Sequence, residues 1–354
     1  MDAVLALQQE NSGFPATIGL VAVFPGPAPT PEQLNDRVRQ RLGPVTRLRL
    51  RMETDARGRL RRPYVWRLAD ELDVACHVAH DRLRSGQCLE DLAADLIGRS
   101  MPRVAGGPLW DLRVVHDAAP GHFALVLRAH HALLDGASML TVMRLLGDDK
   151  AGSVSPVPRE LEAVPAATGG VREMAQALRG LGRRPGRYQC SESVAVSGRT
   201  VAWSSFPADV MDAARKALPE GRTSPNNVFL AAFTSAVHAC PGLLGRGPRL
   251  DRVCAAVPVD LRGPEFRHAL GNFLSGVRVR LPLEMADPMM RLREVGRQMD
   301  DNKRLRSAHG LARFVDYLAG LGGVGVRFVA RQMGIGSLAT FSCSFPGTAK
   351  APRI

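Results

Sequence analysis

The chain of 354 residues is 45% hydrophobic and 23% charged, an ordinary globular balance that excludes an intrinsically disordered protein. A chain of this length is long for one core, so two domains are expected. Lys and Arg number 47 against 34 Asp and Glu, which gives a formal net charge of +13. This charge favours anionic partners such as nucleotide phosphates, an acidic carrier protein or an anionic membrane surface, although a GC-rich genome would also enrich arginine. The arginines are spread along the chain without a recognised binding motif, which predicts no nucleic-acid partner.

The six cysteines are scattered and form no CxxC pair, as expected for thiols in a reducing compartment. The first residues lack the basic and apolar regions of a secretion signal. No apolar stretch approaches the roughly 20 residues that a transmembrane helix needs. We therefore expect a cytoplasmic protein that is at most peripheral on the inner face of a membrane.

Predicted strands and helices alternate through residues 1–146, which we expect to form an N-terminal lobe. Strands are predicted where runs are β-branched or alternate between polar and apolar residues, and helices where apolar residues recur every three to four positions. Thr30 and Pro31 mark the start of one helix, as a capping residue and a proline of the first turn. The expected order is strand 17–24, helix 30–42, strand 47–52, helix 88–101 and a hairpin of strands 109–117 and 122–131.

Residues 147–196 are rich in Pro, Gly and small or charged residues, and they predict an exposed crossover linker. Residues 197–354 again mix strands and helices and are expected to form a C-terminal lobe. The glycine-rich run at 318–336 lacks the strand–GxGxxG–helix context of a dinucleotide site, and predicts a packed helix or a segment resting on a membrane. The sequence thus predicts an α/β (α+β) fold of two similar lobes. The C-terminal half is expected to contain strands 200–206, 252–263 and 275–283 and helices 208–218, 224–239 and 287–305.

One stretch, FALVLRAHHALLDGASML at 123–140, combines a strand, two adjacent histidines, an Asp-Gly pair and a helix. Side chains alternate along a strand, so His131 shares a face with Ala129 while His130 points to the other face. The two rings cannot share one task while the strand persists, and they make a poor metal pair. No third ligand is nearby in the sequence, so we expect no metal site.

Asp135-Gly136 marks the turn into the helix, and Gly136 is expected to adopt a backbone conformation that alanine would strain. A strand, a histidine, a turn and a helix in succession place an imidazole at the rim of a sheet, where a substrate can approach. A neutral imidazole that titrates near neutral pH can remove a proton from a hydroxyl that attacks an acyl carbonyl. The stretch therefore predicts a histidine general base, with a histidine that merely ends a strand as the alternative.

The heptapeptide HHALLDG at 130–136 matches the HHxxxDG motif of the CoA-dependent acyltransferase superfamily. Further elements resemble one branch of it, the bacterial wax ester synthase/diacylglycerol acyltransferase family. They are, in chain order, Pro108-Leu109-Trp110, Asn226-Asn227 where the family usually has Asn-Asp, VPVDLR at 257–262 and LGN at 270–272. The similarity follows the family's order over nearly the whole chain, which is more specific than any single motif.

This resemblance implies a two-lobed, chloramphenicol-acetyltransferase-like fold with the active site in a channel between the lobes. It implies that His131 is the general base, acting on the hydroxyl of diacylglycerol or a long-chain alcohol, with acyl-CoA as a substrate and no separate cofactor. Asp135 is expected to hold the local structure through an ion pair with an arginine, and His130 and Gly136 to support it. The residues expected to shape the channel or its surroundings are Pro108, Leu109, Trp110, Asn226, Asn227 and Asn272.

Two departures from the family pattern stand out. Asn227 replaces an aspartate and removes a charge, and the sequence stops at FSCSFPGTAKAPRI, where the family continues, so an incomplete second lobe is expected. Two alternatives therefore stay open: an acyltransferase or condensation-type enzyme that takes its acyl group from an acyl carrier protein, and a non-catalytic homologue that binds lipid or a partner enzyme. Peripheral contact with a membrane or a lipid droplet is a further expectation.

Overall fold

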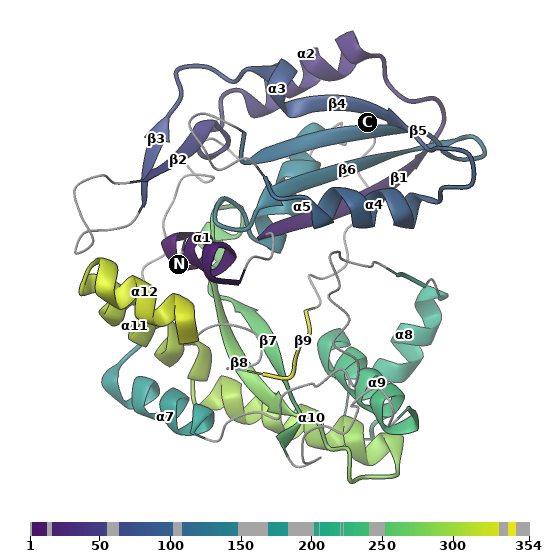
Figure 1. Cartoon of the computed structure of the whole chain (residues 1–354). Helices are drawn as coiled ribbons and strands as arrows, with labels where there is room; N and C mark the ends of the chain where they lie inside the picture. Colours follow the sequence, from purple (N-terminus) through teal and green to yellow (C-terminus); the bar gives the residue numbers. More distant parts are fainter. Residues whose placement is uncertain are drawn as a thin grey trace.

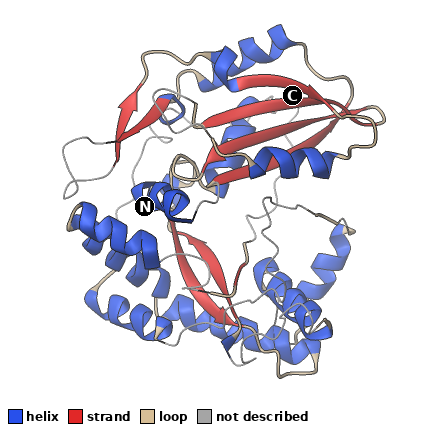
Figure 2. Ribbon diagram, in the orientation of Figure 1, coloured by secondary structure: helices blue, strands red, loops and turns tan. Residues whose placement is uncertain are grey.

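The computed structural model describes residues 2–12, 16–54, 64–101, 108–147, 169–182, 202–204, 206–219, 221, 223–240, 252–332 and 339–344. These residues form two lobes, each built around its own sheet and surrounded by helices (Figures 1 and 2). The mixed helix-and-sheet composition expected from the sequence is confirmed. None of the helices in these ranges is long and apolar enough to cross a bilayer.

The first lobe is built on a four-stranded sheet with the order β1-β6-β5-β4. The inner strand β6 is antiparallel to both β1 and β5, whereas β4 runs parallel to β5. The predicted hairpin is therefore confirmed. Thr17 pairs with His130, so the beginning of β1 lies beside the end of β6. The strands are β1 (Thr17–Pro25), β4 (Val78–Arg82), β5 (Trp110–Ala119) and β6 (His122–His130).

Helices cover both faces of this sheet, because β6 is buried and mostly apolar on both sides. Leu125 and Leu127 belong to the core shared with α2 and α5, while Ala124 and Val126 pack with residues of α4. The predicted alternation of faces along β6 is thus confirmed. The three helices are α2 (Pro31–Leu42), α4 (Leu89–Gly98) and α5 (Gly136–Leu146).

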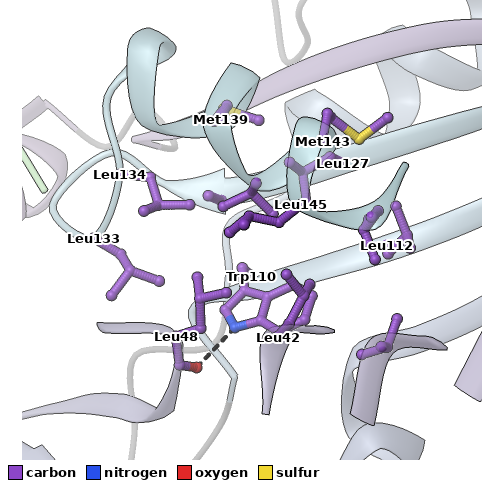
Figure 3. Close-up of a cluster of buried hydrophobic side chains, with 14 of the residues drawn as sticks. Leu42, Leu48, Trp110, Leu112, Leu127, Leu133, Leu134, Met139, Met143 and Leu145 are labelled. Atoms are coloured by element: carbon purple, nitrogen blue, oxygen red, sulfur yellow. Dashed lines mark hydrogen bonds between the residues drawn. The ribbon is translucent and has the colours of Figure 1, made fainter. Parts of the chain in front are cut away.

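A two-stranded hairpin and two short helices complete the first lobe. The sequence predicted a strand over 47–52, but a 3-10 helix occupies the first part of this range and the strand begins at Leu50. The 3-10 turn buries Leu48 and lets its carbonyl accept a 2.8 Å hydrogen bond from Nε1 of Trp110 in the core (Figure 3). These elements are η1 (Thr46–Arg49), β2 (Leu50–Thr54), β3 (Tyr64–Leu68) and α3 (Val74–His77).

In the second lobe, the described residues form a three-stranded sheet with the order β8-β7-β9. β7 is antiparallel to β8 and parallel to β9, and its apolar side packs with buried residues of α9, α10 and α11. The strands are β7 (Cys254–Asp260), β8 (Leu274–Arg280) and β9 (Phe341–Ser342). The helices are α8 (Ala208–Arg215), α9 (Pro225–Ala239), η4 (Pro264–Phe266), α10 (Pro288–Arg304), α11 (Ser307–Gly320) and α12 (Gly323–Gln332).

The structure differs from the sequence expectations at two places in the C-terminal half. Residues 202–204 and 206 of the predicted strand 200–206 do not lie in a strand. Within the expected linker 147–196, residues Val171–Leu181 form α7, because their amphipathic pattern outweighs the Pro- and Gly-rich surroundings. This helix packs closely on α11: a Cβ on Gly310 would lie 2.1 Å from the Glu173 carbonyl oxygen. The rest of that linker lies outside the described residues, and the lobe boundaries stay predictions.

Helix α1 (Asp2–Ser12), which the sequence analysis did not predict, connects the two lobes. Its Ala6 belongs to the core of the first lobe, whereas Val4 and Leu7 pack with Val326 and other buried residues of α11 and α12. The packed helix expected in the glycine-rich run 318–336 is therefore confirmed. α1 lies between the lobes and next to the end of β6 (Figure 1).

Candidate active site

Backbone hydrogen bonds hold the end of β6 and the turn that follows it to two separate segments. The N–H of His130 donates to Leu109 at 2.8 Å, and the N–H of His131 donates to Ala16 at 2.7 Å. The N–H of Leu133 then donates back to the carbonyl of His130 at 2.8 Å and closes the turn. The strand thus ends at His130, one residue before the predicted end, and His131 is the first residue of the turn at its rim.

The ring of His130 is fully buried and serves the turn itself. Its Nδ1 lies 3.0 Å from the backbone nitrogen of Ala132 and accepts that N–H. A ring nitrogen that accepts carries no proton, so in neutral His130 the proton resides on Nε2. This arrangement agrees with the supporting role expected for His130.

Asp135 holds three separate groups with its two carboxylate oxygens. It is fully buried and caps α5, where Oδ1 accepts the N–H of Ser138 at 2.8 Å. Its other oxygen accepts the N–H of Phe273 at 3.1 Å. Nη2 of Arg262 lies 3.0 Å from Oδ1 and 2.9 Å from Oδ2, so the ion pair expected for Asp135 is present. Arg262 and Phe273 belong to the second lobe, and the HHxxxDG loop is therefore joined to that lobe.

The glycine that needs an unusual backbone conformation is Gly271 rather than Gly136. Gly136 opens α5 without a positive φ, and a Cβ there would meet nothing within 4 Å, so the expected strain is wrong. Gly271 has a φ of +147°, and its carbonyl accepts the N–H of Asp135 at 3.1 Å. Its N–H donates to Oγ of Ser138 at 3.0 Å. The left-handed backbone at Gly271 lets the chain approach the loop this closely.

His131 meets the second lobe through one side-chain contact. Its Nδ1 lies 3.2 Å from Oδ1 of Asn272, whose Nδ2 donates to the carbonyl of Ala132 at 2.8 Å. Because Nδ2 faces a carbonyl, the amide oxygen faces the ring, and Nδ1 of His131 must be the donor. The lone pair of neutral His131 is then on Nε2, which has no hydrogen-bond partner among the described residues. His131 as a residue is partly exposed.

The PLW element braces the histidine strand from within the core. Leu109 and Trp110 are 2% and 1% exposed, and the Leu109 carbonyl binds the end of β6 as described above. Trp110 packs against His77 with ring centroids 4.2 Å apart and the rings tilted by 31°, and Nδ1 of His77 donates to the Trp110 carbonyl at 2.8 Å. Burial lowers the pKa of His77. Pro108, which is partly buried, precedes this pair. The element therefore has a structural position behind the histidines.

Asn226 and Asn227 lie in the first turn of α9, in the second lobe. The side chain of Asn227 is 4% exposed and its Nδ2 donates to Oγ1 of Thr223 at 3.1 Å. Neither asparagine has a hydrogen bond to the HHxxxDG loop among the described residues, so the structure does not bring this pair to His131. The channel expected between the lobes stays a prediction.

The fold brings to the loop several residues for which the sequence predicted no role. They are Asp2, Arg47, Ser138, Arg262 and Gly271. Two of them, Arg262 and Gly271, lie in the VPVDLR and LGN segments, so the motif match was a signal for their positions. No motif marked Asp2 or Arg47. Within the described ranges, no group of three or more His, Cys, Asp or Glu side chains is arranged to hold a metal ion.

Known structures share this two-lobed fold. The wax ester synthase/diacylglycerol acyltransferase from Marinobacter aquaeolei VT8 matches 90% of this chain and 75% of its own, with a TM-score of 0.54 and 18% identity. The first condensation domain of the calcium-dependent antibiotic synthetase matches 97% of this chain and 79% of its own, with a TM-score of 0.59 and 18% identity. The two-lobed fold expected of this superfamily is confirmed. The expected shortening of the second lobe stays a prediction.

Relatives in sequence distinguish between the wax ester synthase/diacylglycerol acyltransferases and the condensation domains. The probable diacylglycerol O-acyltransferase tgs1 of Mycobacterium tuberculosis is 27% identical over 308 residues, which cover 78% of this chain and 64% of that relative. The chain thus spans 64% of the length of this relative. Residues 1–231 match the wax ester synthase/diacylglycerol acyltransferase catalytic domain, and residues 270–345 match the C-terminal domain of the same family. The chain belongs to the wax ester synthase/diacylglycerol acyltransferase family.

Proposed function

We propose that this protein transfers a fatty acyl group from acyl-CoA to the hydroxyl group of diacylglycerol or a long-chain alcohol, with His131 as the general base. The observation that carries this proposal is the ring of partly exposed His131, which donates through Nδ1 to Asn272 and thereby leaves Nε2 as the nitrogen that can accept a proton. The family match over residues 1–231 supports the reaction class. The formal charge of +13 suits the phosphates of a CoA donor.

In the proposed mechanism, Nε2 of His131 takes the proton from the hydroxyl group of the alcohol or diacylglycerol while the oxygen of that hydroxyl attacks the thioester carbonyl. A tetrahedral intermediate forms, and its collapse breaks the carbon–sulfur bond. The imidazolium then returns the proton to the departing CoA thiolate, so that an ester and free CoA leave and the base is restored. Throughout the cycle Nδ1–H of His131 keeps its hydrogen bond to Oδ1 of Asn272. This hydrogen bond stabilises the positively charged ring that forms in the first step.

The residues around this base hold its position and take no part in proton transfer. Asp135 and Arg262 fasten the turn to the second lobe, and His130 binds the turn from inside. The PLW element fixes the end of β6 through the carbonyl of Leu109. A general base must lie within hydrogen-bond reach of the proton that it removes, so small shifts of this turn would slow the reaction.

The test is product formation by purified protein supplied with long-chain acyl-CoA and either a fatty alcohol or diacylglycerol. His131→Ala should lower the rate by about 10²–10⁴-fold, the usual contribution of a general base. His122→Ala is the matched control, because His122 begins the same strand but lies exposed in the hairpin turn. Transfer that proceeds equally in His131→Ala and the wild type would refute the proposal.

The acyl donor discriminates between this function and the carrier-protein alternative. A parallel reaction with an acyl-loaded carrier protein in place of acyl-CoA should give no product if CoA is the donor. Product from the carrier alone would assign the chain to condensation-type chemistry. A protein that transfers acyl groups from neither donor, but binds lipid equally well with and without His131, would be a non-catalytic homologue.

Peripheral contact with a lipid surface forms part of the proposed function, and an exposed apolar face on α11 and α12 supports it. Tyr317, Leu321, Val324 and Phe328 are 51–66% exposed. On α12, Phe328 lies one turn after Val324, and Arg331 follows on the same face. Exposed apolar side chains next to arginine match a bilayer surface that contains anionic lipids, whose headgroups attract basic side chains.

Sedimentation with vesicles tests this contact. The wild type should bind vesicles that contain phosphatidylglycerol, and a Val324→Ser/Phe328→Ser variant should bind several-fold less. Phe206→Ser is the matched control, because Phe206 is 57% exposed and lies outside α11 and α12. Unchanged sedimentation of the double variant would refute a role for this face.

A further inference from the structure

The carboxylate of Asp2, at the start of α1, lies behind the contact between Asn272 and His131. Its Oδ1 accepts Nδ2 of Asn272 at 3.2 Å, on the side of the amide away from the His131 ring. Its Oδ2 accepts Nη2 of Arg47 at 2.8 Å and Nε1 of Trp66 at 3.1 Å. A chain of hydrogen bonds therefore runs from Asp2 through Asn272 to Nδ1 of His131.

Arg47 fixes both the carboxylate and the catalytic turn. Its Nη2 donates to the carbonyl of Ala132 at 3.0 Å, and its Nε donates to the carbonyl of Leu133 at 3.0 Å. The same guanidinium lies over the Trp66 ring, 4.8 Å from its centroid. The Asp2 and Arg47 side chains are 26% and 15% exposed, so this cluster is only partly shielded from water.

The chemistry of this cluster sets a direction for every hydrogen bond in it. An ionised carboxylate accepts hydrogen bonds and donates none. Asp2 and the Ala132 carbonyl both face the amide of Asn272, so both require its NH₂ group. The amide oxygen must then face His131, and the ring must place its proton on Nδ1. Two acceptors thereby determine which nitrogen of His131 is free.

We propose that Asp2 is a positioning residue that selects the Nδ1–H tautomer of His131 by fixing the orientation of the Asn272 amide. This inference rests on the proposed function in one respect: Nε2 has to be the nitrogen that accepts the substrate proton. α1 gives the arrangement its geometry, because its apolar residues pack on both lobes. Asp2 reaches Arg47 and Trp66 in the first lobe and Asn272 in the second.

Replacement of Asp2 by asparagine or alanine separates this role from a purely structural one. Asn at position 2 has one acceptor, its amide oxygen, and this oxygen accepts the hydrogen bonds of Arg47 and Trp66. Its NH₂ group therefore faces the NH₂ group of Asn272. That repulsion turns the Asn272 amide over or moves it away, and the Nδ1–H tautomer is lost. Alanine removes one of the two acceptors without adding a donor, so the Ala132 carbonyl alone favours the native orientation of the amide and both tautomers are populated. Asn, although closer in shape to Asp, should therefore be the more harmful replacement.

The experiment reads the tautomer directly, by long-range ¹H–¹⁵N spectra of the imidazole rings without substrate, with His131 assigned from His131→Ala. Wild-type His131 should be the Nδ1–H tautomer, Asp2→Ala a mixture and Asp2→Asn largely Nε2–H. Asp36→Asn is the control, because Asp36 forms an exposed ion pair with Arg39 in α2. Circular dichroism confirms that each variant is folded.

The rates give a second readout in the acyl-transfer assay. Asp2→Asn should lower kcat by about 10²-fold or more with KM little changed, since the wrong tautomer removes the general base. Asp2→Glu, which restores the carboxylate, should recover part of the rate.

Any one of three results would overturn the inference. An Nε2–H tautomer in wild-type His131 would do so without any variant. An unchanged tautomer in folded Asp2→Asn, or a rate above that of Asp2→Ala, would do so as well. Because the spectra need no substrate, they give an answer even if the protein transfers no acyl group, and the proposed function and this inference can fail separately.

Discussion

The two sides of the HHxxxDG loop differ in burial and in how many of their polar side-chain atoms form hydrogen bonds. On one side Asp135 is fully buried, and Arg262 binds both of its oxygens. On the other side His131 is partly exposed, and among the described residues its ring is bonded to Asn272 alone. A buried and fully paired charge resists movement, whereas a partly exposed imidazole keeps a nitrogen for chemistry. The loop thus separates the attachment of the lobes from the reaction.

The largest difference is expected between the two adjacent histidines. His131→Ala should lower the rate by about 10²–10⁴-fold while the free energy of unfolding changes by less than about 0.5 kcal/mol. His130→Ala should cost about 1–3 kcal/mol of that free energy, because the buried N–H of Ala132 loses its acceptor. Urea unfolding and the acyl-transfer assay measure the two effects. Equal destabilisation by both variants would contradict the division between the two sides.

The second comparison uses two carboxylates that bind the same arginine. Asp135 is fully buried, whereas the Asp260 side chain, 2.9 Å from Nη1 of Arg262, is 43% exposed. Asp135→Ala should lower the free energy of unfolding by about 3–5 kcal/mol, since buried Arg262 loses its buried partner and the N–H groups of Ser138 and Phe273 lose their acceptor. Asp260→Ala should cost about 0–1 kcal/mol, because water screens the exposed pair. Denaturant titration checks both, and similar losses would mean that burial does not set the strength of this junction.

A smaller effect is expected at the two glycines that the structure distinguishes. Gly271→Ala should cost about 1–3 kcal/mol, because its φ of +147° suits glycine and a new Cβ would lie 3.1 Å from the ring of Phe273. Gly136→Ala should be neutral or slightly stabilising, because a Cβ there meets nothing within 4 Å. Thermal unfolding of both variants measures the difference. A larger loss of stability in Gly136→Ala than in Gly271→Ala would show that the segment around Gly271 can move away from the loop at little cost.

The smallest effect concerns pH and the buried histidine behind the loop. Burial lowers the pKa of His77 below its ordinary value of 6.5, so the unfolded chain takes up a proton first as the pH falls. The stability that neutral His77 provides is therefore complete above about pH 6.5 and is lost as the pH falls below it. His77→Gln keeps a donor for the Trp110 carbonyl and should flatten the decline in unfolding free energy between about pH 7 and 5. His77→Gln and wild-type curves of equal slope would contradict this account.

Elements that follow local patterns were predictable in both lobes, and α9 and α10 of the second lobe lie within one residue of their expected bounds. β1, α2 and the β5–β6 hairpin lie close to their expected bounds, and Thr30 and Pro31 start α2 as predicted. The prediction was wrong where a contact with residues distant in the sequence sets the conformation of a short segment. Residues 47–49 alternate like a strand but form a 3-10 turn, because Leu48 supplies the acceptor for Trp110. α1 was missed because its sequence is only weakly amphipathic and its packing depends on both lobes.

The sequence predicted most of the residues of the candidate site, but it did not predict which of them are hydrogen-bonded to one another. The sequence named His131, Asn272 and Asp135, and it expected an arginine beside Asp135. It misjudged Gly136, because an Asp-Gly pair resembles a strained turn although Asp135 simply caps a helix. Asn226 and Asn227 were grouped with the site through their motif, yet none of their contacts in the described residues reaches the loop.

The amino-acid sequence alone determined the strand, the two histidines at its end and the helix that follows, because these depend on the periodicity of neighbouring residues. Tertiary structure alone decided the partners of those groups. Arg262 is 127 residues from Asp135, Asn272 is 141 residues from His131, and Asp2 is 270 residues from Asn272. No local pattern specifies contacts over such separations, since they form only when both lobes and α1 have packed together. The direction of hydrogen bonding at His131, and with it the nitrogen left free, follows from that packing.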